Sequence, residues 1–247
     1  MKYGVMGGFI KFAFAKTAFD YIEKEIPELD MPAYKQRALK AYRTIVERTP
    51  GIGSMKDNMF VMTMYAAAFV IALYKTADGK MGPEKLKGLI RAEAYCPLMV
   101  KAKQGKSAFT EKEIAARTKQ SQWSRDHIQE YPMNWYYYFE NVPGKDEYYI
   151  THKQCGICKL TAQEHCEEIT RYLCMMDYYT FEMQGGGAGP DQDPGLWRRR
   201  MQFPSDEPGP RPGDRVCEKP GRKIKEDHHG KEGFGASKDV HERHVSR

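Results

Sequence analysis

The sequence has no apolar run long enough to cross a bilayer as a helix. The run MFVMTMYAAAFVIALY (Met59–Tyr74) has 16 residues, whereas a membrane span needs about 20. We therefore predict that it forms a buried core helix. The opening MKYGVMGGFIKFAFAK has only short apolar pieces, interrupted by Lys11, and no clear cleavage site. We expect no secretory signal.

A strong charge imbalance is also lacking. The net charge is +6 over 247 residues, and both signs are interspersed without a long single-sign block. This pattern lacks the basic footprint of a nucleic-acid-binding protein, so we expect neither a nucleic-acid nor a membrane partner. The balance of 41% hydrophobic and 29% charged residues is typical of a globular protein. Without an export signal we expect a cytoplasmic location, with cysteines present as thiols or ligands rather than disulfides.

The last part of the chain has few core-forming residues. Residues 185–247 hold 11 of the 22 glycines and 7 of the 14 prolines, but only five Ile, Leu or Val. Such a segment buries too little apolar area to offset its chain entropy. We expect it to be disordered, and we expect residues 1–184 to form a single α+β domain.

The first half of that domain, residues 1–130, is predicted to be helical because apolar residues recur every three or four positions. Pro83 suits the first turn of a helix, and Thr110 with Glu113 three residues later is a capping box. The predicted helices are Phe9–Ile22, Tyr34–Val46, Met59–Tyr74, one from Pro83 to about Lys103, and one that begins after Thr110.

Residues 131–184 are predicted to form a hairpin, a helix and a strand. Aromatic residues favour strands at Trp135–Glu140 and Tyr148–His152, and VPGKDE between them has turn chemistry. A second capping box, Thr161-x-x-Glu164, predicts a helix to about Met176, and Asp177–Met183 is predicted to be a strand. The fold class is α+β, with a mostly helical half packed against a small antiparallel sheet and a cysteine-bearing helix.

Four of the six cysteines lie in CGICKLTAQEHCEEITRYLC (Cys155–Cys174), with the spacing C-x2-C-x7-C-x7-C. Structural zinc sites usually have two tight pairs. Only one pair is tight here, which argues against a four-ligand site closed within this stretch. Cys155, Cys158 and Cys174 remain candidate metal ligands, and a divalent metal is an open choice of cofactor.

On one continuous helix, Cys166 and Asp177 would lie within about 20° of each other around the axis, with Cys174 about 80° from Cys166. Cys155 and Cys158 would lie just before the helix start, where a helix N-terminus stabilises a thiolate. The alternative is that these cysteines pack as small hydrophobic residues. His165 fits an exposed residue of the first turn better than a ligand.

The segment THKQCGICKLTAQEHCEEITRYLCMMDY resembles the L-2-amino-thiazoline-4-carboxylic acid hydrolase family. That family has a cysteine after a short strand, then a helix, then Leu-Cys-x-x-Asp, here Cys155 and Leu173 to Asp177. The segments IVERTPGIGSMKDNMFVMTMYAAAFVIALYK and NWYYYFENV are also similar. The resemblance covers roughly residues 1–184.

The resemblance implies an enzyme of cysteine metabolism that hydrolyses a small-molecule thiazoline to N-carbamoyl-cysteine. Asp177 would be the general base, and Cys155 or Cys174 a nucleophile or a metal ligand. Lys153 and Lys159 are candidates to bind the substrate carboxylate. Two alternatives are a non-catalytic module that binds a small molecule or metal through the same cysteines, and a helical interaction protein. The oligomeric state is open.

The resemblance ends where the family continues with two strands that carry Arg-Thr, Gly-Gly and Cys. Here the chain reads GPDQDPGLWRRRMQFP (Gly189–Pro204). A one-base shift of the reading frame turns Met201-Gln202 into Cys and Trp197-Arg198 into Gly, and it permits V-L-T-R-T-L-A-x-G-G-x-x-C-S-F-R. We therefore hypothesise that the chain from about Gly187 is an out-of-frame translation. The protein would then lack two strands and one cysteine of its site, and this truncation could leave it inactive or poorly folded.

Overall fold

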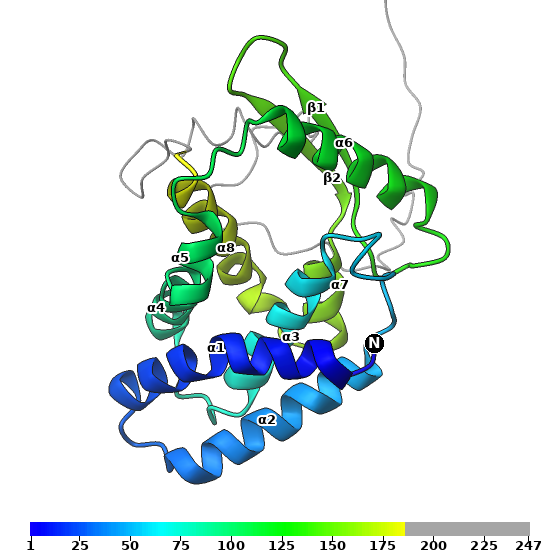
Figure 1. Ribbon diagram of the computed structural model, residues 1–247. Coiled ribbons are helices and arrows are strands. Elements are labelled where there is room, and N and C mark those ends of the chain that lie inside the picture. Colours follow the sequence, from blue (N-terminus) through cyan, green and yellow to red (C-terminus); the bar gives the residue numbers. More distant parts are fainter. Residues whose placement is uncertain (186–247) are drawn as a thin grey trace, which may run out of the picture. The chain divides into compact units, whose positions relative to one another are not determined.

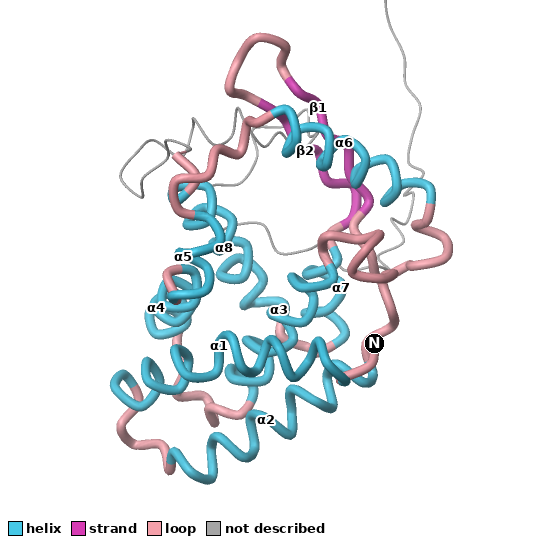
Figure 2. Tube along the Cα trace, viewed as in Figure 1, coloured by secondary structure: helices cyan, strands magenta, loops and turns pink. Residues whose placement is uncertain are grey.

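The computed structural model describes residues 1–185, and the predicted tail lies outside this range. Figures 1 and 2 show helices throughout, with one small hairpin. In chain order the elements are α1 (Gly4–Glu25), α2 (Met31–Arg48), α3 (Val61–Lys75), α4 (Pro83–Ala94), α5 (Pro97–Lys103), α6 (Glu111–Asp126), β1 (Tyr136–Asn141), β2 (Tyr148–Gln154), α7 (Gly156–Gln163), the 3-10 turn η1 (Glu167–Ile169) and α8 (Thr170–Met183).

Helix α3 is the centre of the helical core. It packs against α1, α2 and α7, and every residue from Ala67 to Leu73 is buried. A helix that is apolar around its whole circumference needs this environment, so the prediction of a buried core helix is confirmed. Within residues 1–185, no helix combines the length and the apolar character that crossing a bilayer demands.

Local signals place the starts of α4 and α6 where the sequence predicts them, and a cap that was not predicted begins α2. The Asp30 side chain accepts a hydrogen bond from the Ala33 N–H at 3.3 Å and caps α2. Thr110 caps α6 in the same way, through the Glu113 N–H at 3.2 Å. Pro83 lies in the first turn of α4.

The hairpin is antiparallel and close to its predicted limits, with Tyr137 opposite His152 and Phe139 opposite Ile150. Helix α6 lies along β1 (Figure 1). The Ser121 hydroxyl donates to the Tyr137 carbonyl at 3.1 Å, and the Ser124 hydroxyl donates to the Trp135 carbonyl. These side chains satisfy carbonyl groups of β1 and of the residue just before it, which would otherwise be open to pairing with another strand. The α+β class is confirmed.

Three predicted element limits are wrong. The helix from Pro83 ends at Ala94, and α5 begins separately at Pro97, because proline disfavours helical backbone in the residue before it. Thr161 lies inside α7 rather than before a helix. The predicted strand Asp177–Met183 is the second half of α8.

The single helix predicted from Thr161 to Met176 is in fact two helices separated by a break. Helix α7 ends at Gln163, His165 adopts a positive φ of 54°, and α8 begins at Thr170. The break changes the direction of the chain, so the predicted common face of Cys166 and Asp177 does not exist.

Candidate active site

The middle of α8 carries two of the predicted catalytic side chains. Cys174 and Asp177 are three residues apart on this helix and therefore share a face. Tyr178 lies beside them and interacts electrostatically with both. The helical conformation of residues 177–183, which the sequence did not predict, is what places Asp177 next to Cys174.

Cys155 reaches the same place from a different part of the chain. It connects β2 to α7 and is the residue that caps α7. Its sulfur interacts electrostatically with Asp177 and with Cys174. The structure thus brings together Cys155, Cys174 and Asp177, the three residues predicted to be catalytic.

Both thiols of this cluster are held in the protonated form. Burial raises the pKa of Cys155, and although the backbone N–H groups of Cys158 and Ile157 and the Trp135 side chain favour the thiolate, they do not reverse the rise. Burial also raises the pKa of Cys174 strongly, with Cys155 and Asp177 adding to the effect. The stabilisation of a thiolate by the α7 N-terminus is therefore too weak to ionise Cys155, and ionisation of this thiol needs a base.

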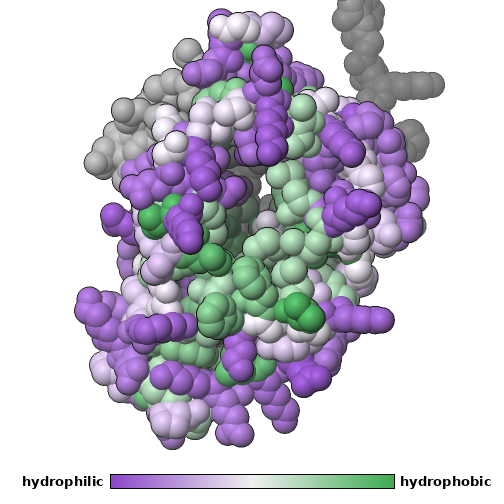
Figure 3. Space-filling view, in the orientation of Figure 1, coloured by the Kyte–Doolittle hydropathy of each residue, from purple (hydrophilic) through white to green (hydrophobic). Residues whose placement is uncertain are grey.

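Asp177 has the properties of such a base. Loss of hydration raises the pKa of its carboxyl group to about 6, while Arg117 and Lys103 pull it in the opposite direction. The side chain nevertheless keeps a solvent-exposed surface. Helix α8, which carries Asp177, borders the hollow that Figure 3 shows between this helix and the hairpin. A carboxyl group with this pKa is largely ionised at neutral pH and can accept a proton.

Two cations other than Lys153 and Lys159, the candidates for binding the substrate carboxylate, act on Asp177. Lys153 is exposed on β2, and the Lys159 ammonium donates to the Pro132 carbonyl at 2.6 Å. Lys103, at the end of α5, and Arg117, in the middle of α6, are the cations that act on Asp177. In the sequence they look like ordinary charges of exposed helices, so no signal distinguished them.

Cys158 and Cys166 have other surroundings. Cys158 is half-buried within α7. Cys166 is buried in the turn after α7 and lies 3.7 Å from the Thr161 carbonyl, and burial raises the pKa of its thiol to about 12. Over residues 1–185, no three His, Cys, Asp or Glu side chains are placed to hold a metal ion.

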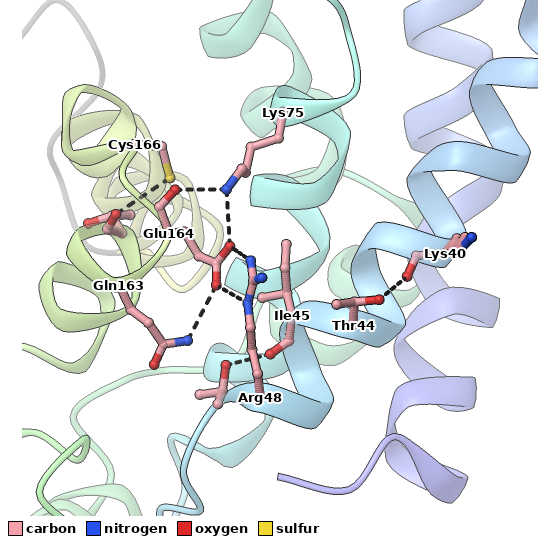
Figure 4. Close-up of polar contacts among 10 residues, drawn as sticks. Lys40, Thr44, Ile45, Arg48, Lys75, Gln163, Glu164 and Cys166 are labelled. Carbon is pink, nitrogen blue, oxygen red and sulfur yellow. Dashed lines mark hydrogen bonds and ion pairs between the residues drawn. The ribbon is translucent and has the colours of Figure 1, made fainter.

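A buried carboxylate fixes α7 in position (Figure 4). Glu164, whose side chain is 0% exposed, accepts hydrogen bonds from both Arg48 of α2 and Lys75 of α3. Lys75 also donates to the Glu164 carbonyl at 2.8 Å. Loss of hydration opposes ionisation of Glu164, but these donors outweigh it and lower its pKa. The cluster joins α2 and α3 to the end of the helix that Cys155 begins.

Surface pockets also occur away from these residues. One of about 500 Å³ lies between the start of α6 and the hairpin turn, with Phe109 and Asp146 in its wall. Another of about 350 Å³ lies between α4 and α8, with Arg91 and Glu182 in its wall. Neither includes Cys155, Cys174 or Asp177.

Comparison with known proteins identifies a family for the part of the chain that contains this cluster. Residues 62–187 match the family described as L-2-amino-thiazoline-4-carboxylic acid hydrolase, and this match includes α3 to α8 with the three clustered residues. No curated protein and no solved structure matches the chain. Because the match covers more than half of the sequence, the chain belongs to the L-2-amino-thiazoline-4-carboxylic acid hydrolase family.

Proposed function

We propose that this protein is a hydrolase that opens the ring of L-2-amino-thiazoline-4-carboxylate and releases N-carbamoyl-cysteine. The observation that carries the proposal is that Asp177 lies close enough to Cys155 and Cys174 to interact electrostatically with both. Membership of the hydrolase family supports the same reaction class. A cytoplasmic location and a part in cysteine metabolism belong to this proposal.

The reaction consumes one water molecule. Its oxygen bonds to C2 of the ring, the carbon that carries the amino group, and the bond between C2 and the ring sulfur then breaks. The sulfur departs as a thiolate and takes up a proton. Asp177 would accept the proton of the attacking water and return it to the departing sulfur, which suits a carboxyl group with a pKa of about 6.

Cys155 offers a covalent variant of the same reaction. In this route Asp177 accepts the Cys155 proton, the Cys155 sulfur bonds to C2, and the ring sulfur leaves with that proton. Water then displaces Cys155 from the adduct. One water proton returns to the Cys155 sulfur, the other goes to the amidine nitrogen, and the oxygen becomes the carbonyl of the same product. Because the Cys155 thiol is protonated at rest, this route depends on Asp177 as well.

The test is release of a free thiol from L-2-amino-thiazoline-4-carboxylate by the purified protein. Asp177→Asn removes the base in both routes and should abolish turnover. Cys155→Ser abolishes turnover only in the covalent route, and trapping of a protein–substrate adduct would identify that route. Cys166→Ser is the matched control, since Cys166 lies outside the cluster and should affect stability alone. Full turnover by Asp177→Asn would refute the proposal.

The reading-frame hypothesis is part of this proposal. The family match ends at residue 187, at the position from which the sequence reads as an out-of-frame translation. The coding DNA tests it, because an early stop or a missing Cys codon in the alternative frame would disprove it. If it holds, the chain as written lacks two strands and a cysteine, and restoring the frame should raise the rate of thiol release.

A further inference from the structure

Arg117 is a cation whose hydrogen-bonding capacity is not filled by the described part of the chain. Its side chain is 17% exposed, and its nearest carboxylate is Glu113 at 4.0 Å, one turn earlier on α6. Its Nε is buried without a hydrogen-bond partner. The guanidinium lies over the Tyr148 ring, 5.3 Å from the ring centroid. A guanidinium has five N–H donors in a fixed plane. The contact with Tyr148 therefore positions Arg117 and leaves N–H donors available to bind a ligand.

Lys103 is a second cation of the same cluster. It is half-buried at the end of α5, and loss of hydration together with the charge of Arg117 lowers its pKa, whereas Glu113 and Asp177 act in the opposite sense. Two poorly hydrated cations near each other destabilise the free protein unless an anion compensates them. Glu113, which is 43% exposed at its side chain, and Asp177 are the anions that act on Lys103, and the Nε of Arg117 still lacks a hydrogen-bond partner.

We propose that Lys103 of α5 and Arg117 of α6 form a carboxylate-binding subsite beside Asp177. This inference rests on the proposed function and names the group that positions the substrate. The planar fork of arginine matches both oxygens of a carboxylate. The substrate class that fits is a small zwitterion with a carboxylate near a cyclic amidine, because Asp177 faces the amidine cation while Lys103 and Arg117 face the carboxylate.

Arg125 provides the matched control for Arg117. It lies two turns later on α6 and also covers a hairpin tyrosine, Tyr138, at 4.8 Å. Its donors are engaged, with bonds to the Tyr137 carbonyl at 3.0 Å and to Ser121 and Gln122. If Arg117 only packs α6 onto the hairpin, replacing either arginine should have the same consequences. Lys101, exposed on α5, is the control for Lys103.

The experiment measures calorimetric affinity for L-2-amino-thiazoline-4-carboxylate and for 2-amino-thiazoline, which lacks the carboxylate. The full-length wild type should prefer the carboxylate ligand. Arg117→Met and Lys103→Met should each lose about tenfold to a hundredfold of that preference, the range of a hydrogen bond to a charged group. Arg125→Met and Lys101→Met should keep it. Arg117→Lys retains the charge but not the planar fork, and it should lose part of the preference for the carboxylate ligand. This variant keeps the test valid if Arg117→Met fails to fold.

Equal affinity of the wild type for the two ligands, or no binding of either, would overturn the inference. So would an unchanged preference in folded Arg117→Met and Lys103→Met. Thiol release separates this inference from the proposed function. Carboxylate preference through these residues without thiol release supports the subsite and refutes the hydrolase, whereas thiol release with an unchanged KM in both variants supports the hydrolase and refutes the subsite.

Discussion

The indole of Trp135 lies directly over Gly156, the residue that follows Cys155. A Cβ at position 156 would be 2.6 Å from the Trp135 ring and 2.8 Å from the Met133 carbonyl oxygen, a backbone atom. The Trp135 ring is itself stacked on Phe60, with centroids 4.4 Å apart. The absence of a side chain at 156 thus lets α7 begin close enough to the core to place Cys155 beside Asp177.

Gly156→Ala should therefore destabilise the protein by about 1–3 kcal/mol, the range for overpacked cores, and should weaken any activity that depends on Cys155. Gly8→Ala is the control, because a Cβ there meets nothing within 4 Å and Gly8 lies inside α1. That change should stabilise the protein by about 0.5–1 kcal/mol. Urea unfolding of both variants measures the difference, and equal midpoints would contradict the packing argument.

The pH dependence of thiol release should report Asp177. Because the base must be ionised, kcat/KM should rise with pH and level off above about 6. Lys103 and Arg117 lower the Asp177 pKa, so Arg117→Met should move this limb to higher pH. The pH–rate profiles of wild type and variant provide the measurement. If the acid limb lies at the same pH in both profiles, the observed ionisation is not that of Asp177.

Removing the Glu164 charge should loosen the junction of α2, α3 and α7. Glu164→Gln leaves Arg48 and Lys75 without their buried partner, and we expect a loss of about 2 kcal/mol, below the value for fully buried pairs because both cations reach solvent. Glu47→Gln, in an exposed pair with Arg43, should change the free energy of unfolding by less than about 1 kcal/mol.

The Glu164 contribution should also depend on pH. Its pKa is lowered in the folded state, so the stabilisation is present above the ordinary glutamate pKa and is lost as pH falls through the folded value. Glu164→Gln should remove this part of the acid sensitivity. A variant that loses stability equally at every pH would show that packing, rather than charge, is what Glu164 contributes.

Glu93 should give the opposite pH dependence. It is 2% exposed in α4 with one carboxyl oxygen lacking a hydrogen bond, and burial raises its pKa well above the ordinary value. Above the unfolded pKa the unfolded chain releases this proton first, so stability should fall with rising pH by up to about 1.4 kcal/mol per unit until the folded pKa is reached.

Glu93→Gln replaces the protonated acid with a neutral group of the same shape. The variant should therefore lose this pH dependence and be more stable than the wild type at pH 8, while differing little from it at pH 5. Chemical unfolding at the two pH values is the measurement. A wild type whose stability is flat between them would show that Glu93 ionises without penalty.

Local signals were sufficient for much of the helical half and for the hairpin. The cap at Thr110 and the proline at position 83 act on backbone groups within one turn, so the sequence was sufficient to predict them. The apolar run of α3 and the turn between β1 and β2 are equally local. The resemblance carried by Cys155, Cys174 and Asp177 was enough to indicate the family.

The limits of the last helices depended on contacts that no local pattern contains. Thr161 followed by Glu164 satisfies the capping pattern, yet Glu164 instead ends α7 because Arg48 and Lys75, distant in sequence, hold its carboxylate. The aromatic residues after Asp177 favour strands locally, but in α8 they pack on other elements, as Tyr179 does on Tyr95 and Phe181 on Phe109. Packing overrode propensity.

The sequence by itself determined the fold class, the buried central helix, the hairpin and the identity of the three clustered residues, because each follows from composition, short-range backbone chemistry or a local motif. Only the tertiary structure decided that Asp177 lies on a helix and that Lys103 and Arg117 are its cationic neighbours. Those relationships join α5, α6, α7 and α8, and charge and burial across separate elements are set by packing rather than by spacing along the chain.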